Sequence, residues 1–115
     1  MCNVNDRIWD NLNIAVIVSD PEFNVTYVNK RAYELFDELK IGGLGVGRNM
    51  AGCHKPETME KLKKIYQDFA DRKIKIHYLT MEGGSEGTLT VVNVPFYDGE
   101  ALGGVMEMVF EQSLA

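Results

Sequence analysis

The sequence predicts an α+β fold in which helices pack on one face of an antiparallel sheet. Three observations predict it: a strand–turn–strand–helix pattern over residues 14–36, a long amphipathic helix beginning near Pro56, and three alternating stretches after Lys73. The resulting order of strand, strand, helices, strand, strand, strand is typical of a layered α+β domain.

The stretch at residues 14–36 organises the rest of the chain. Residues 14–18 carry apolar, mostly β-branched side chains on both faces, which predicts a strand covered on both sides. An Asp-Pro pair at residues 20–21 supplies turn chemistry before a second strand at residues 25–28. Asn29 has the short polar side chain of a helix N-cap, and a helix is predicted over residues 31–36.

The middle of the chain predicts an irregular segment followed by the longest helix. Residues 37–52 are rich in glycine and are interpreted as the flexible wall of a pocket. They neither follow a strand nor carry the Lys-Ser/Thr of a nucleotide-binding loop, so a phosphate site is not expected. A helix is predicted over residues 56–71, where proline and an acidic residue occupy the first turn. Its apolar stripe consists of Met59, Leu62, Ile65, Tyr66 and Phe69.

Three strands are predicted after this helix, at residues 73–80, 88–96 and 104–111, each with alternating side chains. In the first, Ile74, Ile76 and Tyr78 share one face, so His77 is interpreted as an exposed surface histidine. Asp-Gly at residues 98–99 is a hairpin signal, although the connection is predicted to be longer than a two-residue turn.

Two segments resemble a PAS domain. VSDPEFNVTYVN at residues 18–29, followed by Ala32 and Leu35-Phe36, resembles the opening of that family, and VPFYDG at residues 94–99 with GGV at 103–105 resembles its closing hairpin. The resemblance covers about residues 9–110 and implies a PAS-like, five-stranded antiparallel sheet with helices on one face. It also implies a sensor in signal transduction or transcription regulation, which holds a small ligand or cofactor in its interior and relays the signal through sheet or dimer contacts.

The run Cys-His-x-Pro at residues 53–56 is similar to one in a bacterial and archaeal subgroup of PAS domains, and it leaves three interpretations open. His54 is a haem ligand in the first, with Met50, Met81, Met106 or Met108 as second axial ligand. In the second, His54 and Cys53 hydrogen-bond near the helix start and fix the loop. Cys53 is a redox thiol in the third, activated at the positive end of the helix.

Other cofactors are less well supported by the sequence. Gly47-Arg48-Asn49 is similar to the motif of photosensory PAS domains, but Met50 stands where those proteins carry the adduct-forming cysteine, so a flavin adduct is not expected. Cys2, Cys53, His54 and His77 are too scattered to predict a structural zinc site.

The resemblance, together with the apolar patterns, predicts the ligand pocket. The residues expected to line it are Tyr27, Phe36, Met50, His54, Met59, Leu62, Tyr66, Tyr78, Val92 and Met106. A competing interpretation is a ligand-free interaction module with a filled core, because methionine side chains close a cavity as readily as they line one.

The first residues, 1–12, are predicted to form a flanking helix with Ile8, Trp9 and Leu12 on one face. In PAS proteins such a segment lies against the outer face of the sheet or against a second subunit. A homodimer through these three residues is therefore expected, with an effector domain in a longer parent chain as a further partner.

Composition limits the function classes. The 115 residues predict one domain, residues 1–115, and the net charge of −5 argues against a nucleic-acid surface. No apolar run is long enough to span a membrane, there is no signal-peptide pattern, and two cysteines are too few for a disulfide framework, so a cytoplasmic protein is expected. No nucleophile–base pattern is present, and enzymatic activity is not expected.

Overall fold

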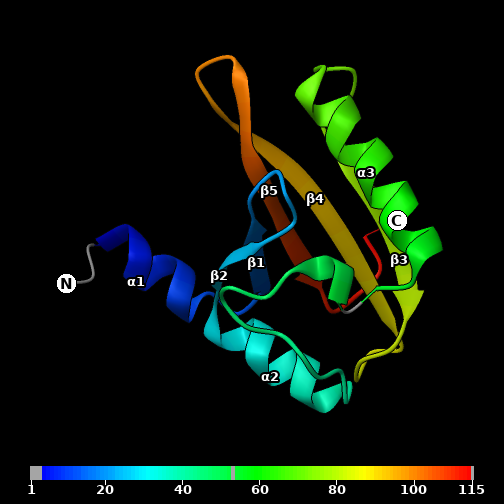
Figure 1. Cartoon of the computed structure of the whole chain (residues 1–115). Coiled ribbons are helices and arrows are strands. Elements are labelled where there is room, and N and C mark those ends of the chain that lie inside the picture. The colour runs from blue at the N-terminus through cyan, green and yellow to red at the C-terminus, as the bar shows by residue number, and fades with distance from the viewer. Residues whose placement is uncertain (1–3, 53, 115) are drawn as a thin grey trace.

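The computed structural model describes residues 4–52 and 54–114, which contain a five-stranded antiparallel sheet with helices on one face (Figure 1). The strands are β1 (Ala15–Ser19), β2 (Val25–Val28), β3 (His77–Glu82), β4 (Thr88–Asp98) and β5 (Ala101–Phe110). Their order in the sheet is β2-β1-β5-β4-β3, so the first and last strands of the chain are neighbours at its centre. The predicted fold class is confirmed.

The helices lie close to where the sequence predicts them. They are α1 (Val4–Asn11), α2 (Lys30–Glu38), the short 3₁₀ helix η1 (Met50–Gly52) and α3 (Pro56–Ala70). α3 has proline in its first turn, as predicted, and ends one residue earlier than expected, while α2 is longer at both ends. No helix in the described part of the chain is both long and apolar enough to cross a lipid bilayer.

Asn29, between β2 and α2, makes four side-chain hydrogen bonds. Its side-chain oxygen accepts from the backbone N–H of Ala32, as predicted for an N-cap, and also from that of Val16 in β1. Its amide donates to the carbonyls of Ile14 and Trp9. This fully buried residue therefore holds the start of α2 against the sheet and the end of α1.

An irregularity in the first hairpin decides which side chains of β2 face the helices. The register shifts between Val18 and Ser19, so Val18 is paired with Tyr27 while Ser19 is paired with Val25. Val25 and Val28 both enter the core beneath α2, whereas Tyr27 lies on the opposite face and donates a hydrogen bond to Asp10 of α1.

Two predicted boundaries in the second half of the sheet were wrong. β3 begins at His77 and not at Lys73, because the chain leaves α3 through Arg72 in a left-handed conformation and Lys73 still bonds back to Asp68. The β4–β5 hairpin pairs Asp98 with Ala101 and closes through a two-residue turn, not a longer connection.

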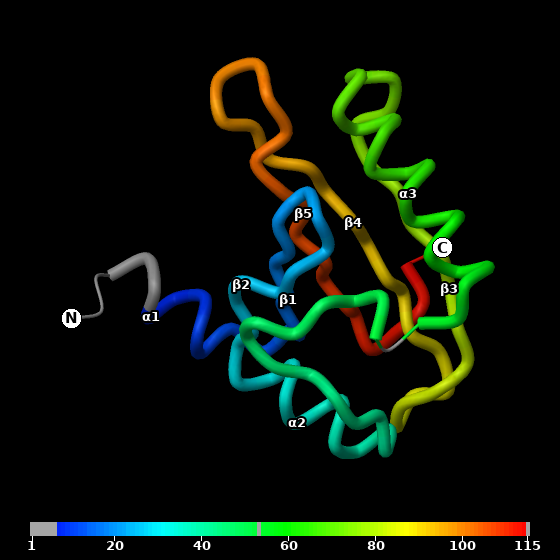
Figure 2. Tube along the Cα trace, in the orientation of Figure 1, coloured from blue at the N-terminus to red at the C-terminus, as the bar shows by residue number. Residues whose placement is uncertain are grey.

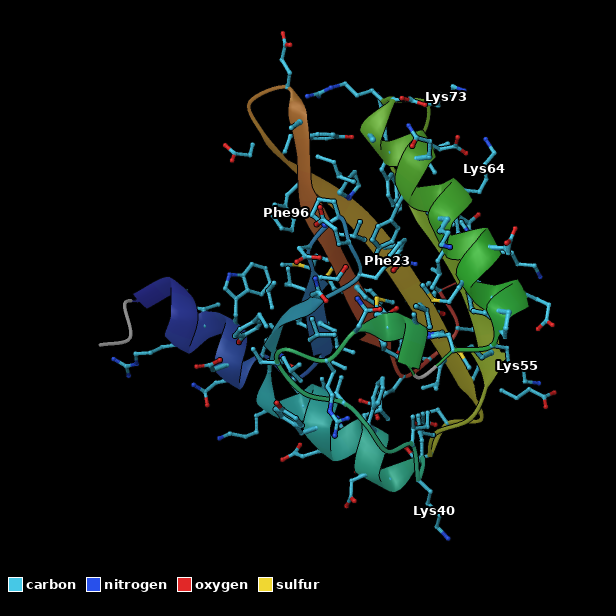
Figure 3. The ribbon with its side chains drawn as sticks, in the orientation of Figure 1. Phe23, Lys40, Lys55, Lys64, Lys73 and Phe96 are labelled. Atoms are coloured by element: carbon cyan, nitrogen blue, oxygen red, sulfur yellow. The ribbon has the colours of Figure 1, made fainter. Side chains whose placement is uncertain are left out.

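The hydrophobic core contains separate clusters at different positions along the sheet. One cluster packs beneath α2 and includes Ala32 and Leu35, while another packs beneath α3 and includes Tyr66 and Phe69. The segment that follows α2 runs back over the sheet to η1, and its residues 47–49 bond along β2 (Figure 2). Phe23 lies inside against Tyr66, with ring centroids 4.4 Å apart, while Lys55, Lys64 and Lys73 point outward (Figure 3).

α1 extends away from the sheet beyond its β2 edge (Figure 1). It contacts α2, and it leaves Ile8 55% and Trp9 38% exposed. The outer face of the sheet is uncovered at its other edge, where Tyr78 is 67% exposed. Within this chain, therefore, α1 does not act as a cover for the outer face.

Candidate ligand cavity

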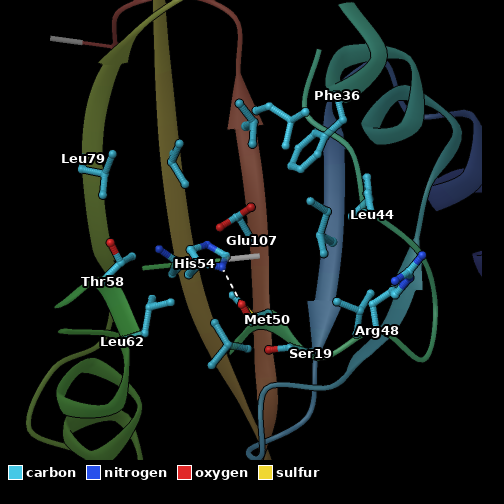
Figure 4. Close-up of a pocket in the computed structure, with 18 of the residues that line it drawn as sticks. Ser19, Phe36, Leu44, Arg48, Met50, His54, Thr58, Leu62, Leu79 and Glu107 are labelled. Atoms are coloured by element: carbon cyan, nitrogen blue, oxygen red, sulfur yellow. Dashed lines mark hydrogen bonds between the residues drawn. The ribbon is translucent and has the colours of Figure 1, made fainter. Parts of the chain in front are cut away.

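A cavity of about 750 Å³ lies between the sheet and its helices, in the gap between the core clusters (Figure 4). Its walls come from the sheet, from α3, from the end of α2, and from the segment containing residues 41–44 and 48–50. The glycine-rich segment thus forms part of the wall of a cavity.

Four strands contribute alternate residues to the floor of the cavity, because successive side chains of a strand point to opposite faces, and β2 adds Val25. They are Ile17 and Ser19 from β1, Val105, Glu107 and Val109 from β5, Leu89, Val91 and Asn93 from β4, and His77, Leu79 and Met81 from β3. The floor is therefore apolar except near Ser19 and along a polar row made by His77, Asn93 and Glu107.

α3 presents one stripe of side chains to the cavity. Thr58, Lys61, Leu62 and Ile65 follow the i, i+3, i+4, i+7 spacing of a single helix face. Lys61 and, on the opposite wall, Arg48 are exposed, so these cations stand at the rim and not at the floor.

His54 lies in the cavity wall between η1 and α3. Its Nδ1 is 2.8 Å from the carbonyl oxygen of Met50. Because a carbonyl only accepts hydrogen bonds, Nδ1 of His54 is the donor in this contact. The ring thus fixes the loop before α3, and its second nitrogen remains available to a ligand.

Tyr66 and Ser19 make a buried polar contact at one end of the cavity. The Tyr66 and Ser19 hydroxyl oxygens are 2.6 Å apart, and the sulfur of Met50 lies 3.8 Å from the Tyr66 hydroxyl. Burial raises the pKa of Tyr66 to about 12, with the Ser19 hydrogen bond acting in the opposite direction. Tyr66 is therefore a neutral hydrogen-bonding group at physiological pH.

Glu107 is the carboxyl group on the cavity floor. Burial raises the pKa of Glu107 above its ordinary value, while the nearby His54 lowers it. Figure 4 shows the carboxyl extending from β5 into the cavity with His54 beside it. The described residues contain no group of three or more His, Cys, Asp and Glu side chains arranged to hold a metal ion.

A family model described as PAS domain matches residues 6–111, which is nearly the whole chain. The chain belongs to the PAS domain family. A comparison with curated proteins found no match.

Solved structures similar to this PAS domain share its fold at low sequence identity. A C-terminal domain from Streptococcus mutans is 20% identical with a TM-score of 0.74, over 96% of this chain and 85% of that chain. The PAS domain of BvgS from Bordetella pertussis is 11% identical with a TM-score of 0.65, over 93% and 82%. A sensory box sensor histidine kinase from Vibrio cholerae is 14% identical with a TM-score of 0.60, over 97% and 91%.

The PAS domain brings together only part of the residue set expected to line its pocket. Residues predicted from the sequence that the structure places in the cavity wall are Phe36, Met50, His54, Leu62 and Tyr66. Met81, predicted as an alternative iron ligand, is also in the wall, whereas Met106 and Met108 are on the other face of the sheet. Cys53, the predicted redox thiol, and Cys2 lie outside the described residues.

Four expected pocket residues, Tyr27, Tyr78, Val92 and Met106, lie on the outer face of the sheet. For Tyr78, Val92 and Met106 the predicted alternation was right, but the wrong face was assigned to the cavity, because both faces carry apolar side chains. For Tyr27 the predicted alternation with Val25 was itself wrong, because the register shifts in the first hairpin. Met59 is buried yet outside the lining, since it is rotated by about 100° from Thr58 around α3.

The polar row on the cavity floor was not predicted from the sequence. His77 was interpreted as a surface histidine, but it lines the cavity because it shares a face with Leu79. Glu107 also lines the cavity, although no pocket role was predicted for it. The signal was present in the alternation, which puts Glu107 on the same face as Val105 and Val109, and Asn93 on the same face as Leu89 and Val91.

Proposed function

We propose that this PAS domain is a sensory and regulatory module that binds a small ligand or cofactor in its cavity and relays occupancy through sheet or dimer contacts. The observation that carries the proposal is the cavity itself. Its volume of about 750 Å³ lies within the range of ligand sites in proteins, and its lining is mostly apolar with a few convergent polar groups.

The position of the cavity supports the proposed relay of ligand occupancy through the sheet. Its walls come from the sheet and from both α2 and α3, so a ligand that prefers one arrangement of these elements shifts the equilibrium toward it. α2 is tied to the end of β5 because Arg31 pairs with Glu111. A change in the sheet is therefore coupled through this ion pair to the residue that follows β5.

The fold neighbours agree with a sensory role. One of the similar structures belongs to a sensory box sensor histidine kinase, and another is the sensor region of a sensor histidine kinase. We extend that role to this chain, with an effector domain or protein as the receiver of the signal.

A cavity-filling variant tests ligand binding. Leu62→Trp places a large ring inside the cavity, whereas Lys63→Trp adds the same ring to the exposed neighbouring position of α3. The probe is N-phenyl-1-naphthylamine, an uncharged fluorophore followed by fluorescence, together with mass spectrometry of molecules extracted from the purified protein. We expect Leu62→Trp to weaken probe binding at least about tenfold because the ring occupies the site, and Lys63→Trp to bind as the parent does.

Thermal unfolding of both variants controls for loss of structure. Equal probe binding by the parent and a folded Leu62→Trp variant would remove the cavity as the binding site. If, in addition, no molecule were extracted, the ligand-free interaction module would be the better account.

A second candidate is haem binding through His54. The specific observation is the hydrogen bond from Nδ1 of His54 to the Met50 carbonyl, because metal-bound histidines commonly orient themselves by such a second bond. The residues that line the cavity fit the group: His54 would supply a nitrogen ligand, Met50 or Met81 a sulfur, and the rim cations Arg48 and Lys61 would pair with carboxylates. When bound, haem iron would supply gas-binding or redox chemistry.

Titration with hemin tests this candidate by absorption spectroscopy. We expect a sharp Soret band for the parent that shifts or disappears in His54→Ala. His77→Ala is the matched control because it removes an imidazole from the same cavity. A featureless spectrum, or a band unchanged in His54→Ala, would eliminate His54 as a haem ligand.

A further inference from the structure

The polar row on the cavity floor is a continuous feature of the sheet. His77 in β3 is the cross-strand partner of Asn93 in β4, and Asn93 is the partner of Glu107 in β5. All three face the cavity, and the positions two residues away along each strand, such as Leu79, Val91 and Val109, are apolar. The polar row is therefore bordered by apolar side chains on the floor of the cavity.

Within the row, Asn93 and His77 are hydrogen-bonded to each other, whereas the Glu107 carboxyl makes no hydrogen bond to either residue. The amide nitrogen of Asn93 lies 3.5 Å from Nδ1 of His77, and Asn93 is buried. Among the described residues, no group hydrogen-bonds the Glu107 carboxyl, and no fully buried side-chain oxygen is left without a partner. The Glu107 oxygens therefore reach the open space of the cavity, where a ligand would meet them.

The charged and hydrogen-bonding groups around Glu107 indicate which chemical group of a ligand would bind beside it. A carboxyl group accepts hydrogen bonds from N–H donors, and a charged partner strengthens the bond. The titratable groups nearest to it are His54 from the loop before α3, His77 from β3 and Tyr66 from α3, none of which hydrogen-bonds it. The permanent cations Arg48 and Lys61 stand at the exposed rim, and a ligand seated on the floor displaces neither.

We infer that the cavity selects a ligand with an apolar body and an N–H donor at its polar end, seated with that end on Glu107 and Asn93. The inference rests on the proposed ligand-binding function and names the ligand class of the same site. The donor is a protonated amine or the N–H of a neutral heterocycle. A ligand whose polar end is a carboxylate is rejected because it would place two carboxyl groups together in an apolar chamber.

A matched set of probes tests the inference by titration calorimetry. 1-Methylnaphthalene has the apolar body alone, 1-naphthylmethylamine adds a cationic donor, and 1-naphthoic acid adds an anion. Indole and 1-methylindole differ in one neutral N–H. We expect the amine to bind at least about tenfold more tightly than the acid, because hydrogen bonds to charged groups are the stronger class.

Substitutions of Glu107 test whether its carboxyl group causes the preference for N–H donors. Glu107→Gln keeps the shape and an acceptor oxygen but removes the charge, so it should weaken amine binding about tenfold while retaining indole. Glu107→Leu should remove the preference for both donors. Glu100→Gln makes the same charge change on the exposed β4–β5 turn and should bind every probe as the parent does.

The outcomes separate this inference from the proposed function. Binding of 1-methylnaphthalene with no preference for amine over acid, or a preference unchanged in folded Glu107→Gln, would overturn the inference alone. Failure of every probe to bind would overturn the proposed function as well.

Discussion

Individual polar residues set the chemical character of the cavity in this PAS domain. Glu107, Asn93 and the Tyr66–Ser19 pair are polar groups placed where apolar side chains would have packed without difficulty. Burying a polar group reduces stability unless it is partnered; Tyr66 and Ser19 partner each other and Asn93 partners His77, so the Glu107 carboxyl is the group here that agrees best with the ligand we propose. Asn29 is the contrasting case, because its polar atoms are fully used in holding the fold together.

Glu107 makes stability depend on pH in a defined direction. Because burial raises the pKa of Glu107, the folded state keeps this proton at pH values where the unfolded state has released it. The free energy of unfolding therefore falls as pH rises from about 4.3, the ordinary value for glutamate, through the raised pKa, and is constant above it.

Glu107→Gln should remove this dependence. We expect the variant to be more stable than the parent at about pH 8 and no more stable at about pH 3.5, where the parent carboxyl is protonated in both states. Urea unfolding at both pH values measures the difference. A stability difference that is the same at both would show that the carboxyl is not a buried titrating group.

Asn29→Ala should destabilise the domain strongly. The substitution removes the N-cap of α2 and leaves buried backbone groups of β1 without partners, a loss of about 3 kcal/mol. Asn13→Ala, at an exposed position, is the control and should change the unfolding free energy by less than about 0.5 kcal/mol. Equal losses in the two variants, measured by urea unfolding, would contradict the role assigned to Asn29.

Among the secondary-structure elements, β5 is the strand on which the others depend. It pairs with β1 on one side and β4 on the other, and it carries Glu107 on its cavity face. Its glycines permit this close packing: a Cβ added at Gly104 would lie 2.2 Å from the backbone oxygen of Ser19 and 2.6 Å from the Phe96 ring. Phe96 is the cross-strand partner of Gly104 and covers the place of its missing side chain.

Gly104→Ala should therefore separate β5 from β1. We expect a loss of about 3 kcal/mol in unfolding free energy, because the closest clash is with a backbone oxygen of β1, which no side-chain movement can relieve. Gly52→Ala is the matched control, since nothing lies within 4 Å of a Cβ built there. A folded, equally stable Gly104→Ala protein would show that the strands tolerate the added methyl group.

At the scale of the whole molecule, the exposed apolar side chains of α1 indicate a place for a second subunit. Ile8 and Trp9 are exposed and Leu12 is half-buried, and α1 extends beyond the edge of the sheet (Figure 1). We propose that two copies associate through α1 and the outer face of the sheet. Burying large aromatic side chains is the usual source of affinity in such interfaces.

Substitutions on α1 test the association. Ile8→Asp and Trp9→Asp should convert a dimer to a monomer by placing a charge in the apolar contact, as measured by light scattering coupled to size-exclusion chromatography. Tyr33→Asp changes an exposed apolar side chain of α2 and should leave the dimer intact. A parent protein that is monomeric at all concentrations would contradict the proposal.

Much of the fold could be predicted from the sequence because the relevant signals are local. The Asp-Pro turn, the Asn29 cap, the proline in the first turn of α3 and the alternation of the strands depend on residues close in sequence. The pocket was predicted less well. The register shift between Val18 and Ser19 moves Tyr27 to the outer face, and it depends on pairing between two strands, not on either strand alone.

The sequence by itself determined the order of the elements, the PAS resemblance, and which side chains of β4 and β5 share a face. Only the tertiary structure decided which face lines the cavity. Val92, Met106 and Tyr78 are as apolar as Val91, Val105 and Leu79, so hydrophobicity does not separate the sets. Packing of α2 and α3 against one face makes the choice, and the same packing places His77, Asn93 and Glu107 together from strands far apart in the chain.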